Sequence, residues 1–245
     1  MTTQAALPRM QLTHPQITRS CAESEVYESL LALDGASVLE LGCGKADHTR
    51  RIATAHPTAK VLAAEVDRIQ HAENLATGTP ANVTFADFGA ESIPLAGASI
   101  DVVLMFRSLH HVPLPRLDDA VGELFRVLKP GGYAYISEPV FAGELNELIR
   151  IFNNEELVRK AAFAAVCRAV DKGMFELANE TFFLVPVKYK DFGEFAAKHF
   201  EVTHSERNVN DAQSLAVERL FNTHLGPDGV KLTQQVRIDL LRKPR

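Results

Sequence analysis

Five short apolar runs alternate with amphipathic segments between residues 37 and 140. A strand that is buried on both faces of a parallel sheet appears as a short apolar run, and the helices between such strands appear as amphipathic segments. The alternation therefore predicts an α/β fold with a doubly wound, mostly parallel sheet and helices on both faces. The five runs are SVLEL, KVLAAEV, VTFA, IDVVLMF and YAYISEP.

A crossover helix and a last strand follow from the spacing of apolar residues. Between the fourth and fifth runs, PRLDDAVGELFRVLKPGG combines helical spacing with a Pro-Gly-Gly stop signal. Near the C-terminus, GVKLTQQVRIDLLR alternates strictly, which predicts an antiparallel strand with one wet face. We expect Val230, Leu232, Val236, Ile238 and Leu240 on the buried face and Lys231, Thr233, Gln235, Arg237 and Asp239 on the wet face.

Residues 141–188 depart from the alternation, because their apolar residues have helical spacing at 145–152 and again at 158–169. We therefore predict a helical cap insertion there. The whole chain, residues 1–245, is expected to form a single domain with a seven-stranded sheet. Its core is expected at about 35–140 and 189–245, and an N-terminal helical segment at about 1–34.

The composition excludes several classes of protein. With 245 residues and 46% hydrophobic content the chain can bury a large core, which excludes a disordered or fibrous structure. A net charge of −5 with dispersed basic residues argues against nucleic-acid binding. No membrane span or signal peptide is visible. Three cysteines without C-x-x-C spacing favour a reducing compartment, so we expect a cytoplasmic protein.

The first apolar run ends in ELGCG, residues 40–44, so a glycine turn follows a carboxylate. A P-loop would need a glycine where Leu39 stands and a Ser or Thr where Ala46 stands. A dinucleotide fingerprint would need a third glycine at Asp47, and Glu40 is a poor neighbour for a pyrophosphate. A zwitterionic or cationic ligand fits better, because a carboxylate stabilises an ammonium or sulfonium group.

This turn resembles the first motif of class I S-adenosylmethionine-dependent methyltransferases, with Ala46 where many relatives carry another glycine. Four further segments follow in the order of that family, so the resemblance covers about residues 37–140. It implies S-adenosylmethionine as the cofactor. The first-motif residues that would bind it are Glu40, Gly42, Cys43 and Gly44.

The second segment, AKVLAAEVDRIQ, offers two acids for the family's contact with the ribose hydroxyls. Matching the strand without gaps puts Glu65 at the strand end, where the family's acid lies. Asp67 then falls where the next helix needs an N-cap. We favour Glu65 as the ribose ligand and keep Asp67 as the alternative.

The third segment, FADFGAESIPLAGASIDVVL, resembles the family's adenine-binding stretch, in which an acid meets the exocyclic amine. Counting back from Pro94 puts Gly89 where many relatives have that acid, and Asp87 lies two residues earlier. Asp87 is expected either to reach the amine, with Gly89 and Ala90 supplying backbone contacts, or to be a solvated loop residue.

The fourth segment, MFRSLHHVPLP, resembles the family's LHHV stretch, which implies that Met105 and Phe106 line the methionine side of the cofactor. Because neighbouring histidines usually point apart and no further ligand has metal-like spacing, we predict no metal site. We expect His110 or His111 to pack or cap, with general-base duty as the alternative. In the fifth segment, Glu138 either faces the substrate or forms a cap or salt bridge.

The function expected from the resemblance is methyl transfer to a small-molecule acceptor by in-line displacement. A sulfonium activates the methyl group, so the protein has mainly to align the nucleophile and exclude water. Substrate specificity is expected from the segment before Ser37 and from the helical cap insertion. The alternatives are an RNA or protein methyltransferase and a cofactor-binding subunit without turnover. The sequence determines neither the acceptor nor the oligomeric state.

Overall fold

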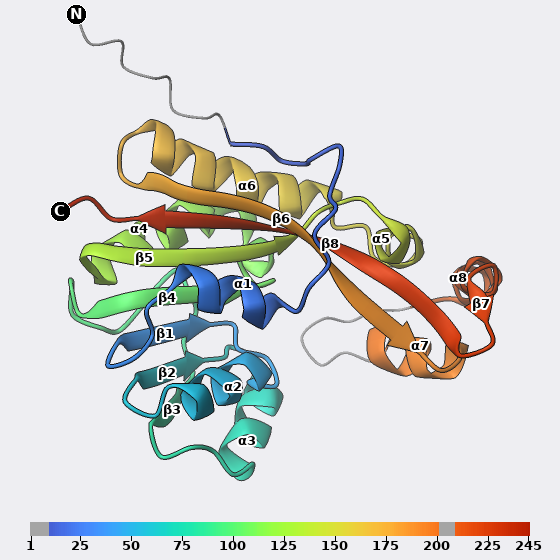
Figure 1. Cartoon of the computed structure of the whole chain (residues 1–245), viewed down its shortest axis with the longest axis horizontal. Coiled ribbons are helices and arrows are strands. Elements are labelled where there is room, and N and C mark those ends of the chain that lie inside the picture. The colour runs from blue at the N-terminus through green and yellow to red at the C-terminus, as the bar shows by residue number, and fades with distance from the viewer. Residues whose placement is uncertain (1–9, 201–208) are drawn as a thin grey trace, which may run out of the picture.

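The computed structural model describes residues 10–200 and 209–245. A mixed sheet with the strand order β3-β2-β1-β4-β5-β8-β6 runs through it (Figure 1). Strands β1 to β5 are mutually parallel, and β8 is antiparallel to both β5 and β6. The strands are β1 (Ser37–Leu41), β2 (Lys60–Ala64), β3 (Val83–Ala86), β4 (Ile100–Phe106), β5 (Leu128–Pro139), β6 (Glu176–Tyr189), the short β7 (Leu225–Gly226) and β8 (Gly229–Arg242).

Helices cover both faces of this sheet, which confirms the predicted fold class. Apolar side chains of α1 and α2 form one core with the sheet, and those of α4 and α6 form another on the opposite face. The helices are α1 (Glu23–Leu30), α2 (Asp47–Ala55), α3 (Arg68–Ala76), α4 (Leu117–Val127), α5 (Glu144–Ile149), α6 (Glu156–Asp171), α7 (Phe192–His199) and α8 (Asp211–Asn222), with 3₁₀ turns η1 (Leu109–His111) and η2 (Leu114–Arg116).

The predicted helical cap insertion at 141–188 is wrong over its last part. Helices α5 and α6 form as their spacing predicted, but residues 176–188 belong to strand β6. Helix α6 also does not cap the domain, because Ala162, Ala165 and Val166 are buried in the core that it shares with α4. Strand β6 is an edge strand whose two faces are both partly buried. Its apolar and polar residues therefore do not alternate clearly, and its sequence does not reveal a strand.

A third apolar core lies where the paired strands β6 and β8 extend beyond β5. Strand β5 pairs with β8 only from Val236 to Arg242, whereas β6 pairs with it from Val230 onward. Helices α5, α7 and α8 pack around the free half of this strand pair, past the carboxyl ends of the parallel strands (Figure 1). We call these three helices the edge cover. The core that they form with β6 and β8 contains the buried apolar residues Leu145, Leu148, Tyr189, Phe195, Val217, Phe221, Val230 and Leu232.

Of the predicted helical segment at 1–34, the described part, residues 10–34, is helical only in α1. Residues 1–9 lie outside the described residues, and the chain before α1 runs as an extended strap that bridges to β6 at Ser20 and Leu184. Leu184 donates its backbone N–H to the carbonyl of Arg19. The strap leaves its own backbone groups available for β6, which a helix would not.

The predicted wet face of β8 is wrong at two positions, because Arg237 is 3% exposed and Asp239 is fully buried. The Arg237 guanidinium lies 4.2 Å from the Phe163 ring of α6 and donates to Asp239 and to the carbonyl of Leu12. Burial raises the pKa of Asp239 to about 6, although the Arg237 charge opposes that rise. The strap and α6 therefore bury Arg237 and Asp239, which the alternation of the sequence alone assigned to the solvent-exposed face.

Candidate active site

The sequence-predicted residues meet at the carboxyl edge of the parallel strands. Strand β1 lies between β2 and β4, so the chain changes direction across the sheet at the β1/β4 junction. Ligands of open α/β sheets bind in the crevice that such a switch point leaves. The loops that follow β1, β2 and β4 all reach this edge.

Two glycines with left-handed backbone build the loop after β1. Gly42 has φ +69° and Gly44 has φ +52°. A Cβ on Gly42 would lie 2.6 Å from the Cβ of Ser108, whereas a Cβ on Gly44 would have no neighbour within 4 Å. Gly42 is therefore required by packing against the loop after β4. Gly44 instead borders open space, which is the kind of cradle that a ligand fills.

Ala46 shows why relatives carry a further glycine at this position. It is fully buried and has φ +58°, which is the left-handed region. For a residue with a Cβ this conformation costs roughly 1–2 kcal/mol. The chain accepts that cost because Ala46 is the N-cap position that directs the loop into α2.

The two acids after β2 have separate roles. Glu65 is 7% exposed, and its carboxylate accepts the backbone N–H of Gly44 at 2.7 Å and that of Asp67 at 2.9 Å. Asp67 caps α3 by accepting the backbone N–H groups of Ile69 and Gln70, which confirms the predicted N-cap. Because a carboxylate has about four acceptor positions, Glu65 keeps two for further donors. Its contact with ribose stays a prediction.

Glu40 is a buried acid beneath the glycine loop. It is 1% exposed, and its carboxylate accepts the hydroxyl of Thr49. Burial raises the pKa of Glu40 to about 8; nearby acids add to the rise and the Thr49 hydrogen bond opposes it. A cation placed next to this group would favour its ionised form.

The structure does not decide between the two predictions for Asp87 in the stretch that resembles the adenine-binding segment. Asp87 is exposed directly after β3, and Ala90 is 5% exposed. A Cβ on Gly89 would collide with the carboxylate of Glu91, which covers the position where relatives carry the acid. Glu91 escaped the sequence reasoning, although it lies only two residues after Gly89.

The predicted pair at the end of β4 divides between the two faces of the sheet. Met105 is 1% exposed and packs into the core with α4 and α6, and its contact with the cofactor stays a prediction. Phe106 lies on the other face and stacks on His48 of α2, with ring centroids 4.1 Å apart. The alternation of a strand sends neighbouring side chains to opposite faces, which explains the difference.

Sequence reasoning also missed a buried acid on α1. Glu23 is 4% exposed and accepts hydrogen bonds from the hydroxyl of Ser137 and the guanidinium of Arg107. These partners stand at the ends of β5 and β4, so Glu23 binds α1 to the carboxyl edge. No local pattern could have shown this, because Ser137 is 114 positions away from Glu23.

His110 lies between two carboxylates. Glu138 accepts the backbone N–H of Leu109 at 3.0 Å and pairs with Nδ1 of the His110 ring. The other ring nitrogen, Nε2, lies 3.8 Å from the carboxylate of Glu155. Burial acts to raise the pKa of Glu138, but the charge and hydrogen bond of His110 outweigh it and lower that pKa. His110 and Glu138 thus form a buried ion pair. A structural role was one of the two predictions for His110, and a salt bridge was one of the two for Glu138.

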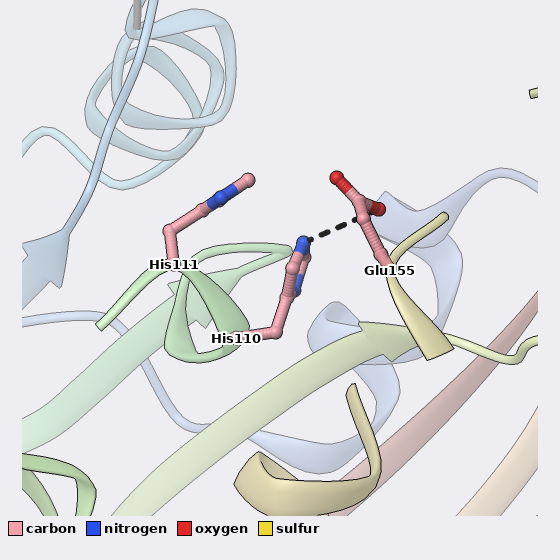
Figure 2. Close-up of side chains that lie close together, drawn as sticks. All are labelled: His110, His111 and Glu155. Atoms are coloured by element: carbon pink, nitrogen blue, oxygen red, sulfur yellow. Dashed lines mark ion pairs between the residues drawn. The ribbon is translucent and has the colours of Figure 1, made fainter. Parts of the chain in front are cut away.

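His111 does not point away from His110, which was the premise for predicting no metal site. Their ring centroids are 4.1 Å apart, and Glu155 at the start of α6 faces both rings (Figure 2). His111 is exposed and His110 is buried. The 3₁₀ turn η1 explains the proximity, because it curls the backbone where an extended chain would have separated the two rings.

Comparison with known proteins agrees with this geometry. Residues 38–132 match a family model described as a methyltransferase domain. The chain is 28% identical over 189 residues to 24-methylenesterol C-methyltransferase 2 of Oryza sativa subsp. japonica, covering 71% of this chain and 50% of that protein. It is 30% identical over 122 residues to the ubiquinone/menaquinone biosynthesis C-methyltransferase UbiE of Stutzerimonas stutzeri, covering 48% and 46%.

Residues 38–132 are therefore similar to a methyltransferase domain, which agrees with the resemblance of this segment to class I S-adenosylmethionine-dependent methyltransferases. A putative methyltransferase from Bacillus halodurans has the same fold, with a TM-score of 0.60 at 16% identity over 91% of this chain and 98% of that one. The chain spans about half the length of the curated relatives it matches.

S-adenosylmethionine is the cofactor of this methyltransferase family, and the open side of Gly44 beside the Glu65 carboxylate fits it. Within the described residues, no helix is both long and apolar enough to cross a bilayer.

We expect Gly44→Ala to weaken S-adenosylmethionine binding at least about tenfold, or roughly 1.4 kcal/mol, because a methyl group would enter the open side of the loop. Gly35→Ala is the matched control, since Gly35 also has a left-handed φ and open space but precedes β1 at the opposite edge. Both variants should lose similar folding stability. Calorimetry with excess chelator measures the affinity, and equal binding by both variants would remove Gly44 from the cofactor site. Gly42→Val is less informative, because it disturbs the packing against Ser108.

Glu65→Ala should weaken cofactor binding by on the order of 2–4 kcal/mol, a factor of roughly 30 to 1,000, because it removes charge-assisted hydrogen bonds to ribose. It should also cost some stability, since two backbone N–H groups lose their acceptor. Asp67→Ala should instead cost about 1 kcal/mol of stability as a lost N-cap, with little change in affinity. Calorimetry and urea denaturation on both variants decide between the acids. A larger affinity loss in Asp67→Ala would make Asp67 the ribose ligand.

Glu40 should make the cofactor-free protein less stable as the pH rises. Its folded pKa of about 8 lies above the unfolded value of 4.5, so the folded state holds more protons between these values. The free energy of unfolding should therefore fall from about pH 5 to about pH 8, by on the order of a few kcal/mol. Glu40→Gln keeps an acceptor for Thr49 but cannot ionise, so its stability should fall less. Parallel pH profiles in urea would contradict this.

Proposed function

We propose that this protein transfers the methyl group of S-adenosylmethionine to a small-molecule acceptor. The observation that carries the proposal is the pairing of Gly44 with Glu65 at the β1/β4 switch point. It combines a backbone turn open to a ligand with a buried carboxylate that has acceptor positions left. The family supplies the cofactor for such a site, and the match to methyltransferases of named activity supports turnover.

S-adenosylmethionine, when bound, supplies a methyl group that its sulfonium charge activates toward nucleophiles. The protein's part is to bind, orient and exclude water. Glu65 would hold the ribose hydroxyls, and Glu40 would stabilise positive charge above the glycine loop. The edge cover and α1 would close the carboxyl edge against solvent.

An acceptor that carries a proton needs a group to receive it. His110 is the best placed, because the bond from its Nδ1 to Glu138 orients the ring and directs Nε2 toward the edge where the acceptor would lie. This general-base role is the alternative to a purely structural His110. It is required only for acceptors that are protonated at the reacting atom.

Three observations favour a small molecule over RNA or protein. The net charge is −5 and the basic residues are dispersed, which suits RNA poorly. The edge cover carries an apolar core of its own next to the site. The named relatives act on a sterol and in quinone biosynthesis, according to their names. We assign substrate specificity to the edge cover and the segment before Ser37.

A reducing compartment such as the cytoplasm fits the cysteines. Cys21, Cys43 and Cys167 are all free thiols, and burial raises the pKa of the Cys43 thiol.

The test is transfer of a labelled methyl group to a metabolite extract, with total RNA and a protein extract as parallel acceptors. We expect label in a small organic product with the parent protein and with Gly35→Ala, and at least about tenfold less with Gly44→Ala at limiting cofactor. Label in RNA or protein would contradict the small-molecule proposal and identify the acceptor as RNA or protein. Cofactor binding without transfer to any extract would indicate a binding subunit without turnover.

A further inference from the structure

Two histidines and a glutamate converge beside the candidate active site. His110 and His111 come from η1 after β4, and Glu155 comes from the start of α6 (Figure 2). One ring nitrogen of each histidine and one carboxylate oxygen of Glu155 all lie within 4.8 Å of one another. Imidazole nitrogens and a carboxylate oxygen are a common ligand set for divalent ions of the zinc type.

The His110 ring is held in the orientation that a metal ligand needs. Glu138 takes its Nδ1, which leaves Nε2 as the atom that faces Glu155. A carboxylate behind a ligating histidine fixes its tautomer and raises its basicity. The 3.8 Å between Nε2 and the Glu155 oxygen is too long for a hydrogen bond. Two ligands about 2.0–2.2 Å from a shared tetrahedral ion would stand roughly 3.3–3.5 Å apart, so a small approach completes the geometry.

His56 provides an internal comparison, because it too stands between two carboxylates. Its ring nitrogens contact Asp34 and Glu28 at 2.9 Å each, so both are satisfied by direct hydrogen bonds. That arrangement is a surface ion pair with no gap to fill. In His110, by contrast, only Nδ1 has a direct partner, Glu138, and Nε2 lies 3.8 Å from Glu155. The ring of His111 lies beside this second nitrogen's side of the site.

The surroundings of Glu155 select the kind of ion. Arg159 and Asn153 each donate to this carboxylate at 2.7 Å, and about two of its four acceptor positions remain. Glu155 is the single carboxylate among the three ligands, whereas Mg²⁺ and Ca²⁺ depend on several oxygen ligands. Two imidazoles favour Zn²⁺, Co²⁺ or Ni²⁺.

We propose that His110, His111 and Glu155 bind one divalent ion of the zinc class at the edge of the candidate active site. Three protein ligands leave a fourth position for water or a substrate oxygen. Ion binding itself is independent of methyl transfer, but an ion on Nε2 of His110 would exclude the general-base alternative for that nitrogen. Any effect of the ion on turnover rests on the proposed function. The cofactor loop contains none of the three ligands, so S-adenosylmethionine should bind with or without the ion.

The experiment measures Zn²⁺ binding by calorimetry and by metal content after dialysis, on the full chain. The parent and His56→Ala should bind one equivalent. His111→Ala and Glu155→Gln should bind at least about tenfold more weakly. His111 is exposed, so its variant should fold as the parent does, and circular dichroism checks both variants. Calorimetry with S-adenosylmethionine, in chelator and in Zn²⁺, should give equal affinities for all four proteins.

The absorption spectrum of bound Co²⁺ distinguishes this site from a site that uses the cysteines. Co²⁺ bound by nitrogen and oxygen should give a tetrahedral absorption spectrum without a thiolate charge-transfer band. A thiolate band, or Zn²⁺ affinity unchanged in both ligand variants, would overturn the proposal and leave His110 as part of an ion-pair network. These results are read without turnover, so they remain distinguishable from a failure of the methyl-transfer proposal.

Discussion

The close approach of Gly42 to Ser108 is the contact on which the rest of the site depends. It brings the loop after β1 against the loop after β4, where a Cβ would lie only 2.6 Å from the Ser108 side chain. Ser108 in turn donates its hydroxyl to the carbonyl of Leu41 at 2.7 Å. With these loops joined, Gly44 reaches the carboxylate of Glu65, and η1 begins where His110 can meet Glu138. Both the cofactor side and the acceptor side of the candidate site follow from this junction.

Buried charge is concentrated along the same edge. Glu23, Glu40, Glu65 and Glu138 are each less than a tenth exposed. Buried carboxylates are costly unless they are paired or neutral, so their number here is a feature of function more than of stability. Glu23 pairs with Arg107 and Glu138 pairs with His110. Glu65 accepts the backbone N–H groups of Gly44 and Asp67, and Glu40 holds its proton because burial raises its pKa.

The antiparallel strand β8 links the parallel strands of the sheet to the edge cover. Its C-terminal half pairs with β5 inside the main sheet, and its N-terminal half carries the third apolar core with β6. One rigid strand therefore determines how α5, α7 and α8 stand relative to the carboxyl edge. In the proposed function, the shape of the acceptor site depends on this strand and on the α1 anchor at Glu23.

The sequence alone determined what depends on local pattern. Strands β1, β3, β4 and β8 coincide with their predicted runs, because burial on one or both faces leaves a period that a short segment displays by itself. The glycine turn and the N-cap at Asp67 were also local, because backbone conformation and capping involve residues a few positions apart. Tertiary structure decided the rest. Strand β6 needed its partner β8, Arg237 and Asp239 became buried only beneath α6 and the strap, and Glu155 met the two histidines only when α6 docked. These contacts join residues far apart in the chain, and their energy comes from packing that no short segment records.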